Sequence, residues 1–411
     1  MGGRVPVSDH PGRGQLASPR TLPPNTAPSP AALTRLLLLL LGFLALLWGI
    51  VGVALAPILP GGWWTLAVLA VACTLIPLGT ILRLRQTRRY AGRWTRLLIL
   101  RPFWYITLAL LLLAPLGVLA MIGGALAGRS VSAEQWTLAI GGIVLAVFLL
   151  AGYLGSRKLV VRRLTIPITD LPEEFDGLRI TQLSDLHVGP HTSRRFLARV
   201  ARQVEELAAD IIVVTGDMVD DFAGDVDIYA SAFGALSAPL GVYAIPGNHD
   251  IYANWPAVRE RLERLPLKVL VNDVHLIRRG NATIAMLGTG DPAGGEGGTE
   301  AGGPDMDAAL DLVPPSVVPI ALAHNPLLWP ALARHGVALT LSGHTHNGQF
   351  AIPALGWSLA SPFLEHTTGL YREGPSRLYI NPGTNYWGIP FRLGTPAEVT
   401  AIELTRDDPG A

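Results

Sequence analysis

Four long apolar runs between residues 37 and 154 constrain this chain more than any other feature of its sequence. None of the runs contains Asp, Glu, Lys or Arg. Each is close in length to the ~20 residues that a helix needs to cross a hydrocarbon layer ~30 Å thick. The sequence therefore predicts four transmembrane helices. The runs cover residues 37–56, 63–82, 103–126 and 136–154.

Two other structures could contain such runs. A soluble helical core could bury them, but four uncharged runs in succession make that origin improbable. A cleaved signal peptide could account for the first run, but a long tail precedes it and three more runs follow, which favours an uncleaved helix. Tryptophans also lie mostly near the ends of the runs, as interfacial aromatic residues do.

The distribution of Arg and Lys predicts the orientation of the spans, because short cytoplasmic loops carry an excess of both. Three segments are basic, and the other two loops hold Arg129 alone. Four spans would place all three basic segments on one side. We therefore expect a multi-pass protein of the cell membrane whose C-terminal domain is cytoplasmic. The basic residues are Arg4, Arg13, Arg20 and Arg35, then Arg83, Arg85, Arg88, Arg89, Arg93, Arg96 and Arg101, then Arg157, Lys158, Arg162 and Arg163.

Composition divides the chain into five parts. The N-terminal residues are rich in Pro, Ser, Gly and Arg, which is typical of a disordered tail. The predicted parts are a tail (1–32), four transmembrane helices (33–156), a basic juxtamembrane segment (157–163), an α/β domain (164–405) and a C-terminal tail (406–411). The net charge is +1, and no basic stripe with interleaved aromatics is present in the C-terminal half, so the sequence predicts no nucleic-acid partner. Cys73 is the only cysteine, which excludes an intramolecular disulfide.

The C-terminal part alternates short apolar runs with helical periods, which predicts an α/β domain with a largely buried sheet core. Apolar positions in residues 194–209 have helical spacing, and residues 255–265 form a weaker helix pattern. Residues 290–304 are rich in Gly, Glu and Pro and predict a mobile surface loop. The predicted strands are residues 178–183, 211–215, 242–245, 284–287, 320–323, 338–341, 378–380 and 399–404.

Five polar clusters follow apolar strands of this domain. Because α/β folds bind ligands at the carboxyl ends of their strands, we expect the clusters to converge. Their Asp, His and Asn side chains offer oxygen and nitrogen donors suited to Zn, Mn, Fe or Ni. Glycines at 216, 247 and 343 would permit tight turns. One Asp after a strand is often only a turn or cap residue, but five clusters in succession make a chance origin improbable. The clusters are Asp185 with His187, Asp217, Asn248 with His249 and Asp250, His324, and His344 with His346.

This set resembles the metal site of the calcineurin-like metallophosphoesterase family, whose pattern is Asp-x-His, Gly-Asp, Gly-Asn-His-Asp/Glu, a lone His, and Gly-His-x-His. The likeness is greater to the bacterial membrane-associated branch, through residues 184–189, 247–250 and 342–349. It covers about residues 164–405 and implies a four-layer αββα sandwich, two sheets flanked by helices. Residues 381–384 read Asn-Pro-Gly-Thr where related proteins often have a Ser-Arg-Gly-type turn, a departure that concerns the substrate rim.

The resemblance also implies cofactors and roles. The cofactors would be two divalent metal ions, drawn from Mn, Zn, Fe and Ni. His249 would lie beside the metals without binding them, and would stabilise the transition state or protonate the leaving group. The resemblance assigns Asp185, His187 and His346 to one metal, Asn248, His324 and His344 to the other, and Asp217 to both.

The chemistry of phosphoesters agrees with this assignment. Two cations ~3.5–4 Å apart can neutralise and orient the substrate. Metal-bound water can reach a pKa near ~7, which supplies hydroxide to attack phosphorus. His249 suits proton donation because an unperturbed histidine has a pKa of about 6.5. The sequence thus predicts a membrane-anchored phosphatase or phosphodiesterase, with a lipid-linked or cell-envelope phosphoester among the candidate substrates.

Two other functions compete with this one. A non-catalytic membrane receptor or scaffold could use a hydrolase-like domain, but no expected ligand is missing. A transporter built on the spans would need polar groups in the membrane, and the runs contain no ionisable Asp, Glu, Lys or Arg. The predicted partners are a phosphoester substrate and membrane lipids, because residues 157–163 could attract anionic head groups.

Overall fold

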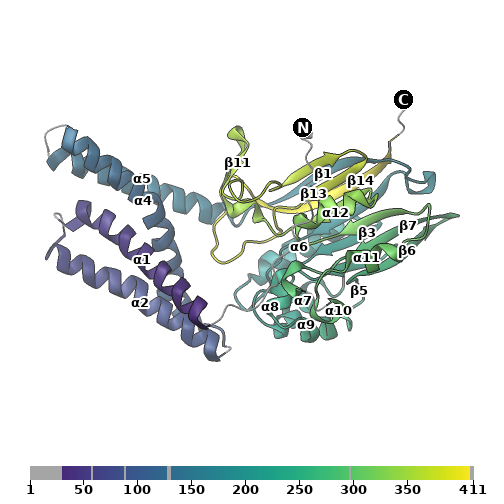
Figure 1. Ribbon diagram of the computed structural model, residues 1–411, viewed down its shortest axis with the longest axis horizontal. Helices are drawn as coiled ribbons and strands as arrows, with labels where there is room; N and C mark the ends of the chain where they lie inside the picture. The colour runs from purple at the N-terminus through teal and green to yellow at the C-terminus, as the bar shows by residue number, and fades with distance from the viewer. Residues whose placement is uncertain (1–29, 57–58, 88, 127–130, 296–297, 408–411) are drawn as a thin grey trace. The chain divides into compact units, whose positions relative to one another are not determined.

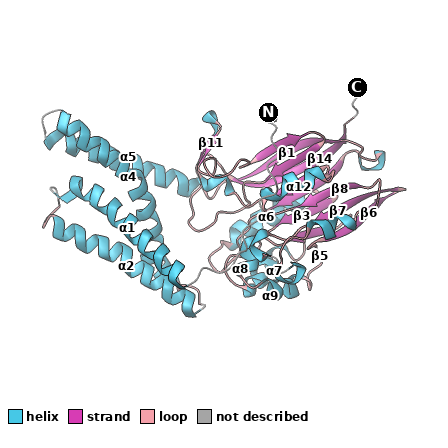
Figure 2. Cartoon of the chain, in the orientation of Figure 1, coloured by secondary structure: helices cyan, strands magenta, loops and turns pink. Residues whose placement is uncertain are grey.

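The computed structural model describes residues 30–407 except 57–58, 88, 127–130 and 296–297 (Figure 1). The chain forms two compact units, a helical unit within Thr26–Gly152 and an α/β unit within Tyr153–Ala411. All the described strands belong to the α/β unit (Figure 2). The expected tail at 1–32 lies outside the described residues except at its end, where the first helix begins at Pro30.

Each predicted apolar run falls on one long helix, apart from Ala56, which follows the end of the first helix. The helical unit contains α1 (Pro30–Leu55), α2 (Trp63–Thr87), α3 (Arg93–Thr95), the π-helical turn η2 (Arg96–Leu100) and α4 (Arg101–Leu126), and α5 (Val131–Gly155) begins there. Two described segments, Trp63–Leu84 and Arg96–Leu119, are long and apolar enough to cross a membrane. Shorter apolar helices cover Leu37–Val53 and Ile140–Gly155.

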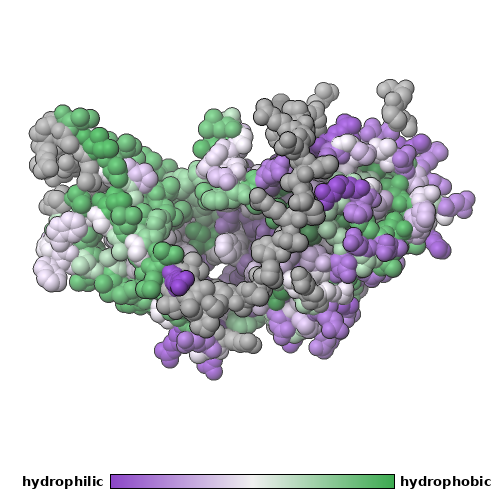
Figure 3. Space-filling view, in the orientation of Figure 1, coloured by the Kyte–Doolittle hydropathy of each residue, from purple (hydrophilic) through white to green (hydrophobic). Residues whose placement is uncertain are grey.

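The helical unit has a small core and an apolar exterior. Leu44 of α1 packs with Phe103 and Leu110 of α4 in that core. Large apolar side chains face outward, among them Trp64 at 83% and Leu39 at 71% exposure. Figure 3 shows this unit as predominantly hydrophobic on the visible face. A continuous apolar surface is stable only when lipid or protein covers it, so the expectation of a membrane region agrees with the packing.

The α/β unit contains two six-stranded sheets. The first has the order β1 (Leu159–Ile168), β14 (Ala397–Arg406), β2 (Leu178–Leu183), β3 (Ile211–Thr215), β4 (Val242–Ile245) and β5 (Lys268–Val269). The second has the order β12 (Gly369–Glu373), β13 (Ser376–Ile380), β9 (Leu339–Ser342), β8 (Val318–Leu322), β7 (Ala282–Gly288) and β6 (Asp273–Arg279). β2 to β5 are mutually parallel, and so are β13, β9, β8 and β7.

The main core lies between the two sheets, where Ile180 and Val213 of the first sheet pack with Ile320 and Leu341 of the second. Helices cover the outer face of each sheet. The first sheet carries α6 (Arg194–Leu207), α7 (Val226–Phe233) and α9 (Trp255–Leu262), and the second carries α11 (Met306–Asp311) and α12 (Trp329–Arg334). The α/β sandwich with two sheets is therefore as expected.

Shorter elements are α8 (Asn248–Tyr252), α10 (Gly298–Ala301), β10 (Ala351–Ile352), β11 (Trp357–Ser358), and the 3₁₀ turns η3 (Glu173–Phe175), η4 (Ala223–Asp225), η5 (Pro292–Gly294), η6 (Pro326–Leu328), η7 (His346–Gln349) and η8 (Pro353–Leu355).

Two segments differ from the sequence expectations. β1 begins at Leu159, so most of the expected juxtamembrane segment 157–163 is an edge strand paired with β14. The sequence pattern did not predict this strand because the strand contains charged residues. Arg162 is exposed, and its side chain forms an ion pair of 2.8 Å with the buried carboxylate of Glu398 on β14. The expected loop at 290–304 contains the helical turns η5 and α10 in its described part, and it buries Asp291.

Candidate metal centre

The predicted ligands converge at the carboxyl ends of parallel strands from both sheets. Asp185 follows β2, Asp217 follows β3 and Asn248 follows β4 in the first sheet. His324 follows β8, and His344 and His346 follow β9, in the second. Because the sheets pack face to face, these strand ends meet at one edge of the sandwich. The buried side chains of Asp185, Asp217, His187, His324 and His346 lie there within three groups of metal-binding geometry that also include His249.

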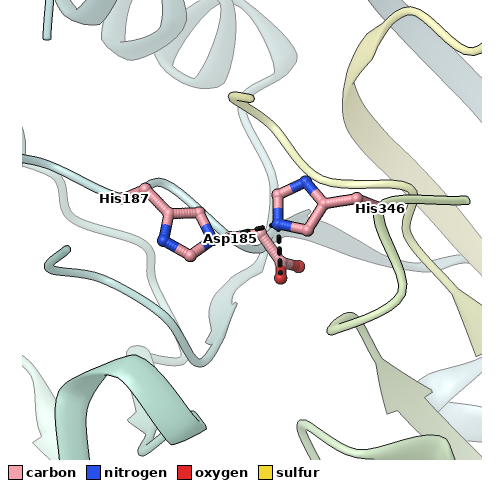
Figure 4. Close-up of side chains that lie close together, drawn as sticks. All are labelled: Asp185, His187 and His346. Carbon is pink, nitrogen blue, oxygen red and sulfur yellow. Dashed lines mark hydrogen bonds and ion pairs between the residues drawn. The ribbon is translucent and has the colours of Figure 1, made fainter. Parts of the chain in front are cut away.

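Asp185, His187 and His346 form the first group (Figure 4). His187 Nε2 lies 2.9 Å from His346 Nε2, and His346 Nε2 lies 3.3 Å from Asp185 Oδ1. The Asp185 carboxylate is fixed from behind, because Ser184 Oγ and the backbone N–H of His344 both donate to it. Three ligand atoms therefore face one point.

Asn248, His324 and His344 meet on the other side of Asp217. Asn248 Oδ1 lies 2.9 Å from His344 Nδ1 and 3.2 Å from His324 Nε2. His324 Nδ1 lies 2.7 Å from the carbonyl of Thr215. A carbonyl can only accept, so Nδ1 of His324 carries a proton, and Nε2 is the ring nitrogen directed at the cluster.

Asp217 lies between these two sets. Its Oδ2 is 3.3 Å from His324 Nε2 and 3.6 Å from His187 Nε2. Its Oδ1 accepts a hydrogen bond of 2.8 Å from the backbone N–H of His249. Asp217 also belongs to two of the three ligand groups. A carboxylate in this place can contact a cation on either side.

The separations between ligand atoms fit cation binding. With metal–nitrogen bonds of about 2.1 Å, two neighbouring ligands lie about 3.0 Å apart in an octahedral shell and about 3.4 Å apart in a tetrahedral one. The separations here run from 2.9 to 3.6 Å. Two imidazole nitrogens at 2.9 Å also need a shared proton or a shared cation between them, because both atoms are otherwise acceptors. The donor set of His nitrogens and Asp or Asn oxygens suits first-row transition metals.

Backbone conformation at the site is unusual. Five of the expected ligands have positive φ, a region in which non-glycine residues are uncommon. Such conformations cost ~1–3 kcal/mol each and cluster at functional sites, where the surrounding fold compensates. The five are Asp185 at 53°, His187 at 42°, Asp217 at 52°, His344 at 72° and His346 at 47°.

All three glycines leave no room for a Cβ, and Gly216 also has a positive φ. Gly216 has φ of 85°, as the expected tight turn requires. A Cβ at Gly247 would overlap Asp217, and a Cβ at Gly343 would overlap Ser184 and Asp185. Neither Gly247 nor Gly343 is among the positive-φ residues of the described chain. These two glycines therefore let neighbouring loops approach the predicted ligands, and Gly343 also lies in a tight turn, because its carbonyl accepts a hydrogen bond of 2.9 Å from the backbone N–H of Thr345.

Burial and mutual charge shift the pKa values of the cluster in opposite directions. Burial would lower the pKa of His324, but Asp217 and Asp185 outweigh it and hold that pKa well above its usual range. Burial would raise the pKa of Asp217, but His324, and then His187 and His249, outweigh it and lower that pKa. Burial, followed by the repulsion of His324, lowers the pKa of His344 to about 4. Burial, with His187 and Arg392, holds the pKa of His346 well below its usual range. His344 and His346 are therefore neutral at pH 7, as metal ligands must be.

His249 borders the cluster on its open side. Its Nδ1 lies 2.9 Å from the carbonyl of Asp220, so Nδ1 donates and Nε2 is left available. Its ring lies edge-on to Tyr252 and to Trp387, with ring centroids 5.8 Å away in each case. Tyr252 is 65% exposed and Trp387 50% exposed, so these aromatic rings form part of the solvent-facing rim of the site.

Sequence reasoning missed Asp220 and Arg392, which support the cluster, and it named Asp250 in a motif without giving it a role. Asp220 Oδ1 lies 3.5 Å from His187 Nδ1 and 3.7 Å from His249 Nδ1, and its spacing of three from Asp217 was the available signal. The buried carboxylate of Asp250 accepts from the backbone N–H groups of Met218, Val219 and Gly247. Arg392 Nη2 lies 3.0 Å from His346 Nδ1 and also donates to the carbonyl of Pro382. No local motif marks Arg392, because the fold alone brings it here.

Two packed sheets with a largely buried cluster of Asp, His and Asn side chains at their strand ends are the features of a metallophosphoesterase domain. The sequence profile of the family described as calcineurin-like phosphoesterase matches residues 178–348. A zebrafish (Danio rerio) transmembrane protein with metallophosphoesterase domain is 33% identical over 390 residues, which cover 89% of this chain and 87% of that protein. On this likeness the chain belongs to the calcineurin-like metallophosphoesterase family.

Other relatives share the domain over different lengths. The cow (Bos taurus) protein of the same description is 32% identical over 295 residues, which cover 68% of this chain and 66% of that protein. An uncharacterized metallophosphoesterase of Bacillus subtilis is 28% identical over 287 residues, covering 67% of this chain and 98% of that protein. The family therefore includes both proteins described as transmembrane and uncharacterized bacterial proteins.

Proposed function

We propose that this protein is a membrane-anchored, metal-dependent phosphoester hydrolase of the bacterial membrane-associated branch. One observation carries the proposal: side chains from residues 185 to 346, supplied by both sheets, meet with ligand atoms 2.9 to 3.6 Å apart. A non-catalytic receptor or scaffold has no need for such a costly arrangement of buried, partly charged groups.

The proposed ligand sets follow the two sides of Asp217. Asp185, His187 and His346 would hold one divalent cation, and Asn248, His324 and His344 the other. Asp217 would contact both, since its Oδ2 lies between His187 and His324. When bound, two such cations neutralise phosphate charge and lower the pKa of bound water. Mn, Zn, Fe and Ni all suit this donor set.

We assign proton donation to His249. Its position is fixed twice, because its backbone N–H donates to Asp217 and its ring Nδ1 donates to the Asp220 carbonyl. The protonated ring therefore presents Nε2–H as its free donor. A leaving-group oxygen at hydrogen-bond distance could take this proton. His249 belongs to one of the ligand groups by distance, so metal retention must be measured in its variants.

The membrane region is proposed to be residues 33–156, with four spans and a cytoplasmic hydrolase domain at 164–405. The support is the apolar exterior of the helical unit and the basic loops on one predicted side. Anchoring brings the site to the membrane, where lipid-linked or cell-envelope phosphoesters are the proposed substrates. Labelling of residues after 165 from outside intact cells would contradict this orientation.

A variant series with a matched control tests the hydrolase. The full chain, loaded with Mn or Zn, should hydrolyse p-nitrophenyl phosphate or its bis ester. Asp217→Asn and His344→Ala should abolish turnover, because each removes a ligand. His249→Ala should slow turnover with metal content retained. His335→Ala is the control, since His335 is exposed and bonds only within its own helix end. Full activity in both ligand variants would refute the mechanism.

A further inference from the structure

An uncharged, apolar hairpin begins four residues after the last predicted ligand, His346. We define it as residues 350–364, which include β10 and β11 and contain no Asp, Glu, Lys, Arg or His. It exposes Phe363 by 80%, Leu355 by 74% and Leu359 by 47%. In Figure 1 the segment around β11 projects from the α/β unit, and in Figure 3 this projection is green and pale rather than purple. Exposed apolar side chains gathered on one projection mark an interaction surface.

The hairpin is joined to the rim of the metal centre. Phe350 forms a bridge with Leu393, and Ala351 donates a backbone hydrogen bond of 2.8 Å to the Leu393 carbonyl. Gln349 exchanges two side-chain hydrogen bonds with the backbone of Trp387, at 2.9 and 3.0 Å. Trp387 is the ring that lies against His249. Gln349 and Trp387 therefore connect the hairpin to the predicted proton donor.

The root of the hairpin also lies where the chain enters the α/β unit from α5. Gly155, the last residue of α5, lies so close to the Arg392 carbonyl that a Cβ at Gly155 would overlap it. Arg157 and Lys158 follow the end of α5 and are exposed. Arg199 Nη2 donates a hydrogen bond of 2.7 Å to the Arg157 carbonyl. This side of the unit thus combines an apolar projection with neighbouring cations, and it carries the connection to an apolar helix. Proteins that bind anionic membrane surfaces use this combination.

We propose that the hairpin inserts into the interface of an anionic lipid bilayer and presents the His249 rim to phosphoester head groups of membrane lipids. This substrate class rests on the proposed hydrolase function, whereas insertion of the hairpin does not. A lipid surface is the favoured occupant because the same chain has two helical segments apolar enough to cross the bilayer, and because the apolar helix α5 ends at this side of the unit.

Nitroxide labels on the full chain test the insertion. Leu355→Cys and Phe363→Cys would be made in a Cys73→Ser background and reconstituted in vesicles of phosphatidylglycerol and phosphatidylethanolamine. Both labels should collide more with dissolved oxygen than with an aqueous nickel chelate. A label at Leu312→Cys, at the end of α11 and 52% exposed, should show the reverse. Nickel access at 355 and 363 equal to that at 312 would overturn the proposal, and so would exclusion of both reagents, which indicates a protein partner.

Kinetics of a double variant tests the substrate class. Leu355→Ser combined with Phe363→Ser should lower hydrolysis of phosphatidic acid or phosphatidylglycerol in vesicles by about tenfold or more, and leave hydrolysis of soluble p-nitrophenyl esters unchanged. Leu312→Ser is the matched control. Equal loss on vesicle and soluble esters, or no loss on either, would overturn the assignment. If the parent chain cleaves no ester, the hydrolase proposal fails, and the nitroxide result still decides the insertion.

Discussion

At the scale of single residues, the chemistry of the site was readable but its geometry was not. The sequence pointed to the candidate Asp, His and Asn ligands because each stands in a short polar motif after a strand. It could not show that Gly343 serves by lacking a side chain, or that Arg392 lies beside His346, since both facts depend on loops from distant parts of the chain. The sequence also could not predict the positive φ of five candidate ligands, because Asp and His residues do not by themselves indicate a left-handed backbone.

Gly343→Ala should disrupt the first ligand set. The added methyl group would overlap Ser184 Oγ and Asp185 Oδ2, so the Asp185 carboxylate must move. We expect metal affinity to fall by at least about tenfold, measured by titration of the chelator-treated protein. Gly224→Ala is the control, because nothing lies within 4 Å of a Cβ at Gly224. Unchanged affinity in Gly343→Ala would show that metal binding does not require the close approach of these loops.

Asp291 should make stability depend on pH in the metal-free protein. Burial raises the pKa of this carboxyl group to about 6, and its Oδ2 has no hydrogen-bond partner within the described structure. Between pH 4 and 6 the folded protein therefore holds a proton that the unfolded chain releases, so stability falls as pH rises through that window. The full effect is about 3 kcal/mol. Asp291→Asn should be more stable than the parent at pH 7, by denaturant titration, and should lack this dependence. Parallel pH profiles for both proteins would contradict the prediction.

At the scale of elements, buried strands were predicted well and edge elements poorly. β3 and β4 are almost wholly apolar because both faces of their sheet are covered, and β2 keeps buried apolar residues at Leu178, Ile180 and Leu183. β1, β6 and β12 lie at sheet edges and carry charged residues, so their sequences lack that signal. The helical turns in 290–304 were missed because glycine content hides elements that tertiary contacts stabilise.

Asp250 should connect two elements of the first sheet. Its carboxylate accepts three backbone hydrogen bonds, which join the loop after β3 to the start of α8. Asp250→Ala would leave these buried donors unsatisfied and should destabilise the protein by about 3 kcal/mol or more, measured by denaturant unfolding. Asp227→Ala, at a side chain 75% exposed, is the control and should change stability little. Similar losses of stability in both variants would show that the buried Asp250 carboxylate stabilises the fold no more than an exposed Asp does.

At the scale of the whole molecule, the division into an apolar helical unit and an α/β unit follows directly from composition. The sequence could not show how far each helix extends or which side chains form the small helical core, because apolar residues cover every face of these helices. Alkaline carbonate should leave the full chain in the membrane pellet, and detergent should release it. Release by carbonate alone would show that the helices do not span the bilayer.

The number of metal ions bound tests the central claim most directly. Elemental analysis of the purified full chain, after loading with Mn or Zn and removal of free metal, should give two ions per chain, and Asp217→Asn should hold fewer. If the parent chain binds no more metal than a variant lacking both Asp217 and His344, the converging side chains are not a metal centre, and the proposed hydrolysis has no basis in this site.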